Sequence, residues 1–178
     1  MSLKSTPQKF GIVAITIHWV SALAIFALIT TGLRTDAAAT TAAKVALLQV
    51  HIPFGIAVLL LTVIRIGWWL LADSKPRPLP ASGLQNRLSG IVHVLFYVAI
   101  LGLGLSGIGM LILSGAGPSI VEGSAANLPD FSEYPPRRLH GIAARLMIAL
   151  LALHTVAALY HQFVIRDGLL NRMWFGAR

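Results

Sequence analysis

Four long apolar runs are the feature of this sequence that most restricts its fold. They cover residues 10–33, 45–71, 88–113 and 139–165. A helix that crosses the hydrocarbon core of a bilayer needs about 20 apolar residues, and each run meets that length. Charged residues make up only 11% of the chain and its mean hydropathy is +0.78, whereas soluble domains carry about 25% charged residues. The sequence therefore predicts an all-α membrane protein, a four-transmembrane-helix bundle forming a single domain over residues 1–178.

The first apolar run follows a short basic segment, which gives the start of the chain the outline of a signal peptide. The apolar core of a signal peptide is usually about 7–15 residues long. This run is longer, because it extends from Phe10 to Leu33. We therefore expect an uncleaved first helix.

The basic residues between the runs predict the orientation of the helices, because cytoplasmic connections are enriched in Lys and Arg. The termini and the 72–87 connection carry Lys4, Lys9, Lys75, Arg77, Arg87, Arg166, Arg172 and Arg178. The other two connections carry Arg34, Lys44, Arg137 and Arg138. Eight residues against four place both termini in the cytoplasm and the 114–138 loop outside.

Other residue patterns exclude several classes of function. The formal net charge is +8, but the basic residues form no patch with interleaved aromatics, so we expect no nucleic-acid partner. The chain has no cysteine, which excludes disulfides, iron–sulfur clusters and covalently attached c-type haem. A Gly-x-Gly-x-x-Gly pattern at 102–107 lies inside an apolar run and lacks the preceding strand of a dinucleotide-binding turn. We expect close helix packing there instead.

Two histidines, His140 and His154, lie fourteen residues apart on the last apolar run. Fourteen residues make nearly four helical turns, so both imidazoles leave the same face, roughly 21 Å apart along the axis. With the predicted helix directions, His51 reaches the outer depth of His140 and His18 the inner depth of His154. Ionisable groups at membrane depth usually mark functional sites. Each pair suits one b-type haem held between two neutral imidazoles.

A structural interpretation of the four histidines stays open, in which the imidazoles bond to the backbone or hold helices together. A zinc or copper site fits less well. Such a metal needs three or four ligands around one atom, and each depth supplies one pair.

Three short motifs surround these histidines: Ile15-Thr16-Ile17-His18-Trp19, His51 with Gly55 one turn later, and His140-Gly141 followed by His154. Over about residues 8–175 the chain resembles the bacterial cytochrome b561 family, which is related to the cytochrome b subunits of hydrogenases and formate dehydrogenases. The resemblance implies four helices in a bacterial inner membrane and two b haems. It assigns the axial ligands to His18, His51, His140 and His154.

The resemblance also implies electron exchange with quinone in the membrane. In small members of the family it implies an oxidoreductase that oxidises superoxide at the outer face and reduces ubiquinone. The alternative is a non-catalytic anchor subunit that relays electrons between a periplasmic dehydrogenase and quinone. The four basic residues of the outer connections would attract a small anion, whereas three acidic residues of the 114–138 loop weaken that field.

Three further residues are candidates for cofactor binding toward the inner side. Arg65 lies at the inner depth of the second run, where it either binds a haem propionate or extends to the inner water. His93 also lies at this depth and competes with His18 as the partner of His154. For His93 and His161 the structural interpretation is a polar anchor at the membrane interface. The functional interpretation is a hydrogen bond to a haem propionate or a quinone carbonyl, or a role in a proton relay. No stretch of the sequence visibly repeats another.

Overall fold

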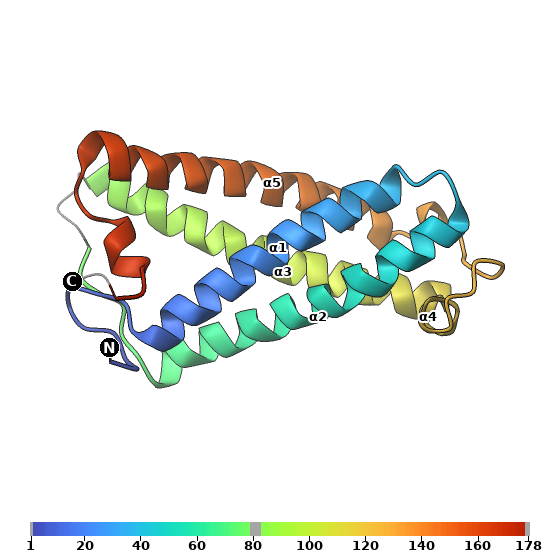
Figure 1. Cartoon of the computed structure of the whole chain (residues 1–178), viewed down its shortest axis with the longest axis horizontal. Helices are drawn as coiled ribbons and strands as arrows, with labels where there is room; N and C mark the ends of the chain where they lie inside the picture. The colour runs from blue at the N-terminus through green and yellow to red at the C-terminus, as the bar shows by residue number, and fades with distance from the viewer. Residues whose placement is uncertain (1, 79–82, 177–178) are drawn as a thin grey trace.

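The computed structural model describes residues 2–78 and 83–176, and its main elements are four long helices (Figure 1). They are α1 (Ile12–Asp36), α2 (Thr41–Leu71), α3 (Gly83–Ser114) and α5 (Pro136–Tyr160). One π-helical turn, η2 (His161–Ile165), extends α5. All four helices are long and apolar enough to cross a membrane. The predicted all-α bundle of four membrane-spanning helices is confirmed.

Helices α2, α3 and α5 begin before the apolar runs that predicted them, whereas α1 begins two residues after the start of its run. α2 starts four residues early, after Thr40, whose hydroxyl accepts a hydrogen bond from the Ala43 amide (3.2 Å) and caps the helix. α3 is already helical at Gly83, so the last five residues of the expected 72–87 connection belong to it. Pro80 is the last proline of that connection, and nothing after it prevents helical hydrogen bonding. Residues 79–82 of the expected connection lie outside the described part.

The 114–138 loop contains two short elements that the sequence did not predict. They are α4 (Gly117–Val121) and the 3₁₀ turn η1 (Phe131–Glu133). The Gln49 side chain of α2 donates to the carbonyl oxygen of Ile120 (2.8 Å) and fastens α4 to the bundle. Arg137, at the start of α5, pairs with Asp36 at the end of α1. The loop therefore folds back on the helix ends, and we call this end of the bundle the outer end.

Both chain termini lie at the opposite end of the bundle, which we call the inner end (Figure 1). The amide and hydroxyl of Ser5 donate to the carboxylate of Asp73 (3.0 and 2.8 Å). The guanidinium of Arg172 donates to the carbonyl oxygens of Gln8 (2.8 Å) and Arg77 (2.7 Å). These contacts tie the N-terminal segment, the connection after α2 and the C-terminal tail together.

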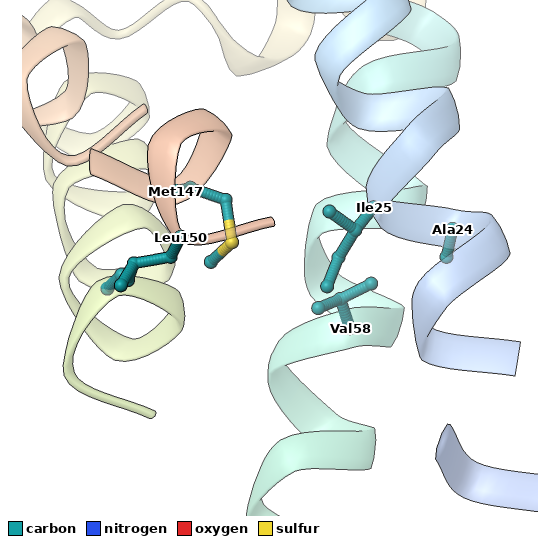
Figure 2. Packing of buried hydrophobic residues seen from close by; sticks show 6 residues of the cluster. Ala24, Ile25, Val58, Met147 and Leu150 are labelled. Carbon is teal, nitrogen blue, oxygen red and sulfur yellow. The ribbon is translucent and has the colours of Figure 1, made fainter. Parts of the chain in front are cut away.

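The four long helices pack as two antiparallel hairpins. α1 packs mainly on α2, and α3 packs mainly on α5, while the contact between the hairpins is narrower and runs chiefly through α2 and α3. Buried side chains from all four helices form a cluster at mid-height: Ala24, Ile25, Val58, Ala99, Met147 and Leu150. Figure 2 shows Ile25 beside Val58, with Met147 and Leu150 of α5 across from them. This apolar cluster separates the outer half of the bundle from the inner half.

Candidate haem-binding sites

His51 of α2 and His140 of α5 face each other toward the outer end. Their ring centroids are 6.3 Å apart and their ring planes are inclined by 61°. The two residues come from different hairpins, so their rings meet across the contact between hairpins. The structure therefore brings together the two histidines that their depth in the membrane paired in the sequence.

His18 of α1 and His154 of α5 meet toward the inner end in almost the same geometry. Their ring centroids are 6.2 Å apart and the ring planes are inclined by 62°. His93 of α3 also approaches His154, with centroids 6.0 Å apart and planes at 76°. The inner level thus gathers three imidazoles. The close match between the His18–His154 and His51–His140 geometries favours His18 over His93 as the partner of His154.

The spacing of both pairs fits one metal atom held between two imidazoles. A metal–imidazole bond is about 2.0 Å and the ring centre lies about 1.1 Å behind the bonding nitrogen, so two opposed ligands have centroids about 6.2 Å apart. The two measured separations, 6.2 and 6.3 Å, agree with this value. Within residues 2–78 and 83–176, no three His, Asp or Glu side chains form a group able to hold a metal ion by themselves. Two nitrogen donors at each level suit the axial positions of haem iron, because the macrocycle supplies the remaining donors.

Hydroxyl groups of neighbouring helices contact both outer histidines, and the sequence analysis missed them. Thr31 Oγ1 of α1 lies 2.9 Å from Nδ1 of His51. Ser106 Oγ of α3 lies 3.0 Å from Nδ1 of His140. A hydroxyl on a helix commonly bonds to the carbonyl of its own preceding turn, so the sequence carries no signal that singles out these two.

Two glycines make room for the same two rings. A Cβ atom at Gly32 would lie 3.3 Å from Cε1 of His51, and one at Gly107 would lie 3.7 Å from Cε1 of His140. In the Gly-x-Gly-x-x-Gly pattern at 102–107, a Cβ at Gly104 would meet the Leu59 side chain at 2.8 Å. Gly104 and Gly107 thus lie at close contacts of α3 with other helices, as expected, whereas a Cβ at Gly102 would meet nothing within 4 Å, so the expectation is wrong there.

Gly32→Ala is expected to disturb the outer histidine pair, whereas Gly107→Ala is expected to leave it unchanged. At 3.3 Å the new methyl group forces the His51 ring to move, while 3.7 Å is ordinary van der Waals contact. Both variants gain the helix propensity of alanine, up to about 1 kcal/mol, so a difference between them reports the contact with the ring. Low-temperature EPR of the oxidised protein measures the effect. Identical spectra for the two variants would contradict this account.

Arg65 of α2 lies at the inner level and carries an unsatisfied donor. Its Nε atom is buried and has no hydrogen-bond partner among the described residues. Leaving a buried guanidinium N–H unpaired is costly, and a carboxylate is the group that pairs best with it. The inner level therefore suits an anionic substituent such as a haem propionate.

His161 lies two helical turns beyond His154, in the π-helical turn that ends the span. Its Nδ1 pairs with the carboxylate of Asp167. Partial burial raises the pKa of Asp167, but hydrogen bonds from His161 and from the Leu169 amide outweigh this effect and hold that pKa below its ordinary value. The carboxylate therefore stays ionised at neutral pH and fixes His161 at the inner boundary.

The two hairpins repeat the same placement of these residues, although their sequences do not look alike. An offset of 75 positions relates α1 to α3, so that His18, Thr31 and Gly32 correspond to His93, Ser106 and Gly107. An offset of 89 positions relates α2 to α5, so that His51 and Arg65 correspond to His140 and His154. The same spacings connect buried residues of the mid-height cluster, with Ala99 following Ala24 and Met147 following Val58. At the inner level the repeat is broken, because α2 has Arg65 where α5 has His154.

Comparison with known proteins agrees with this architecture. The sequence model of the family described as prokaryotic cytochrome b561 matches residues 9–176. Cytochrome b561 homolog 2 of Escherichia coli (strain K12) is 26% identical to this chain, over 97% of it and 95% of the relative. The probable superoxide oxidase CybB of Yersinia pestis is 28% identical, over 93% and 96%. Cytochrome b562 of Cereibacter sphaeroides is 30% identical, over 69% and 65%.

The family match covers nearly the whole chain, and four apolar spans fit a multi-pass protein of the bacterial inner membrane. Cytochromes of this kind bind haem b and transfer electrons. The chain therefore belongs to the prokaryotic cytochrome b561 family, a family of haem-binding membrane proteins of electron transport.

Proposed function

We propose that this protein binds two b haems, oxidises superoxide at its outer end and reduces ubiquinone within the membrane. One haem would be held by His51 and His140 and the other by His18 and His154. The observation that carries the proposal is the pair of nearly identical imidazole arrangements, 6.3 and 6.2 Å between ring centroids, one toward each end of the bundle. When bound, haem supplies reversible one-electron chemistry.

The chain itself keeps the two histidine levels apart and excludes water between them. Val58 follows His51 by seven residues, and Met147 follows His140 by seven, so both lie midway between the levels. Their exposed fractions are 3% and 2%. A dry apolar layer of this kind prevents side reactions with water.

The outer end carries four basic residues, two of which lie near acidic groups. Arg137 pairs with Asp36, and the charge of Lys44 acts on Asp130. Arg34, in the last turn of α1, and Arg138, in the first turn of α5, are exposed. Attraction of superoxide toward the outer histidine pair is therefore assigned chiefly to Arg34 and Arg138.

Reduction of ubiquinone needs two electrons and two protons. Two superoxide ions give two molecules of oxygen and two electrons, which with two protons convert ubiquinone to ubiquinol. His161, held by Asp167 at the inner boundary, is the residue that we assign to proton supply. Arg65 and His93, at the inner level, are assigned to hydrogen bonds with an inner haem propionate or with a quinone carbonyl.

The probable superoxide oxidase of Yersinia pestis aligns with this chain over nearly the full length of both, which supports the same activity here. The second candidate is an anchor subunit that relays electrons between a periplasmic dehydrogenase and quinone. It is favoured by the folded outer loop, in which α4 is held against α2. An ordered loop at the outer end offers a surface to a soluble partner.

The purified protein, reconstituted with ubiquinone in liposomes, is expected to consume superoxide and to form one ubiquinol for every two superoxide ions. Because attraction of an anion is electrostatic, the rate should fall as the salt concentration rises. Arg34→Ala with Arg138→Ala should lower the rate constant severalfold at low salt. Stopped-flow absorbance at low and high salt measures this effect.

Lys4→Ala with Lys9→Ala removes the same charge from the inner end and serves as the matched control, with an unchanged rate expected. Wild-type protein that leaves superoxide untouched, yet accepts electrons from a co-purifying soluble subunit, would overturn the oxidase proposal in favour of the anchor subunit.

A further inference from the structure

We propose that Thr31 and Ser106 are positioning residues for the two outer histidines. They fix the tautomer and ring orientation of each imidazole and make it a more basic ligand. The proposal rests on His51 and His140 as ligands of the outer haem. It adds that the two hydroxyl groups, one on each hairpin, influence the redox potential of the outer haem.

The hydrogen bonds of each hydroxyl determine which ring nitrogen carries the proton. Thr31 Oγ1 donates its single proton to a carbonyl of the preceding turn, that of Ala27, at 2.7 Å. With the hydroxyl proton on this carbonyl, we assign the 2.9 Å contact with Nδ1 of His51 as one in which the ring N–H donates and the hydroxyl accepts. His51 is therefore protonated at Nδ1, and its Nε2 lone pair is available for a metal.

Ser106 repeats this arrangement on the other hairpin. Its hydroxyl donates to the carbonyl of Gly102 at 2.6 Å and lies 3.0 Å from Nδ1 of His140. His140 is thus also protonated at Nδ1, with Nε2 available. The same hydrogen-bond arrangement occurs at two positions 75 residues apart, so a chance contact explains it poorly.

The inner histidines are held differently. His18 packs edge-on against Trp19, and His154 packs edge-on against Phe96. Among the residues that the structure describes, no hydroxyl bonds to either ring. Hydrogen bonding to the far nitrogen of a ligating imidazole raises its basicity, so this electronic effect of a hydroxyl acts at the outer level and not at the inner one.

Removing one acceptor should make the corresponding imidazole a weaker donor and stabilise ferric iron less. In Thr31→Val, which keeps the shape of the side chain, the midpoint potential of the outer haem should therefore rise. We expect the ferrous-to-ferric ratio at a fixed applied potential to increase severalfold, up to about tenfold, which corresponds to ~59 mV for one electron. Ser106→Ala should shift the same haem in the same direction.

The test is a spectroelectrochemical titration of the detergent-purified, haem-loaded protein, together with low-temperature EPR. Thr31→Val and Ser106→Ala should both shift the same one of two redox transitions and the same low-spin ferric signal. Thr31→Ser and Ser106→Thr keep a hydroxyl and should restore both readouts. Thr30→Val is the matched control, because the Thr30 hydroxyl bonds to the Phe26 carbonyl of the same helix at 2.9 Å.

The proposal fails if Thr31→Val behaves like Thr30→Val, or if it lowers thermal stability while both potentials stay unchanged. It also fails if the hydroxyl-retaining variants do not restore the potential. Failure of the ligand assignment has a different signature, in which His51→Ala retains two haems with unchanged EPR signals. If Thr31→Val does not accumulate, Ser106→Ala tests the same prediction on the other hairpin.

Discussion

His140→Ala is expected to leave this protein with one bound haem instead of two. Its ring lies opposite His51 with centroids 6.3 Å apart, and the proposed outer haem would lose one of its two axial ligands. His154 of the inner pair lies fourteen residues from His140 along α5, so this pair should keep its haem. A pyridine haemochrome assay, normalised to protein concentration, measures the loss.

His51→Ala should produce the same one-haem protein, and the double variant with His140→Ala should resemble either single variant. Residues that serve one site are not additive, so the double variant is the sharper test. His161→Ala, on the same helix as His140, is the control and should retain two haems, because His161 is held by Asp167 at the inner boundary. Two haems in the double variant would refute the outer pairing.

The loss of the inner haem is the second large effect, and it distinguishes His18 from His93. Both rings approach His154, at 6.2 Å for His18 and 6.0 Å for His93. The 62° inclination of the His18 pair nearly equals the 61° of the outer pair, whereas the His93 pair has 76°. We therefore expect His18→Ala to remove the inner haem, and His93→Ala to retain both while changing a potential or the quinone kinetics.

Haem content and EPR of the two single variants decide between the two histidines. Combining His18→Ala with His51→Ala should remove both haems, since the variants act on different pairs. Suppose instead that His93→Ala removes one haem and His18→Ala removes none. Then α3 supplies the inner ligand, and the assignment carried by the family resemblance is wrong at this position.

The sequence was most informative about which segments cross the membrane and at what depth each residue lies. In lipid the backbone must satisfy its own hydrogen bonds, so a long apolar run has to be a helix. Helix rise then converts residue number into depth. This is why the runs predicted four helices and why depth alone paired His51 with His140, which the structure shows as neighbours. Hydrophobicity does not predict where a polar helix end lies, such as the capped start of α2 after Thr40.

Lateral arrangement was much less accessible from the sequence. Depth placed His93 and His18 at one level but could not rank them, because that depends on how α3 and α1 are rotated. Thr31 and Ser106 were missed for the same reason, since many helical hydroxyls satisfy themselves on the preceding turn. The repeat between the hairpins is hard to see in the sequence because residue identity is kept at only a few positions, such as His51 and His140. Elsewhere, as with Val58 and Met147, only spacing and burial are preserved.

The division of the bundle into two hairpins has a consequence for how the protein is made. α1 lies mainly on α2 and α3 mainly on α5, so each hairpin can insert into the membrane as a unit. Both proposed ligand pairs connect one hairpin to the other, His51 with His140 and His18 with His154. Because ligand binding and assembly would then be one equilibrium, we expect the supply of haem to the membrane to determine how much of the inserted chain matures.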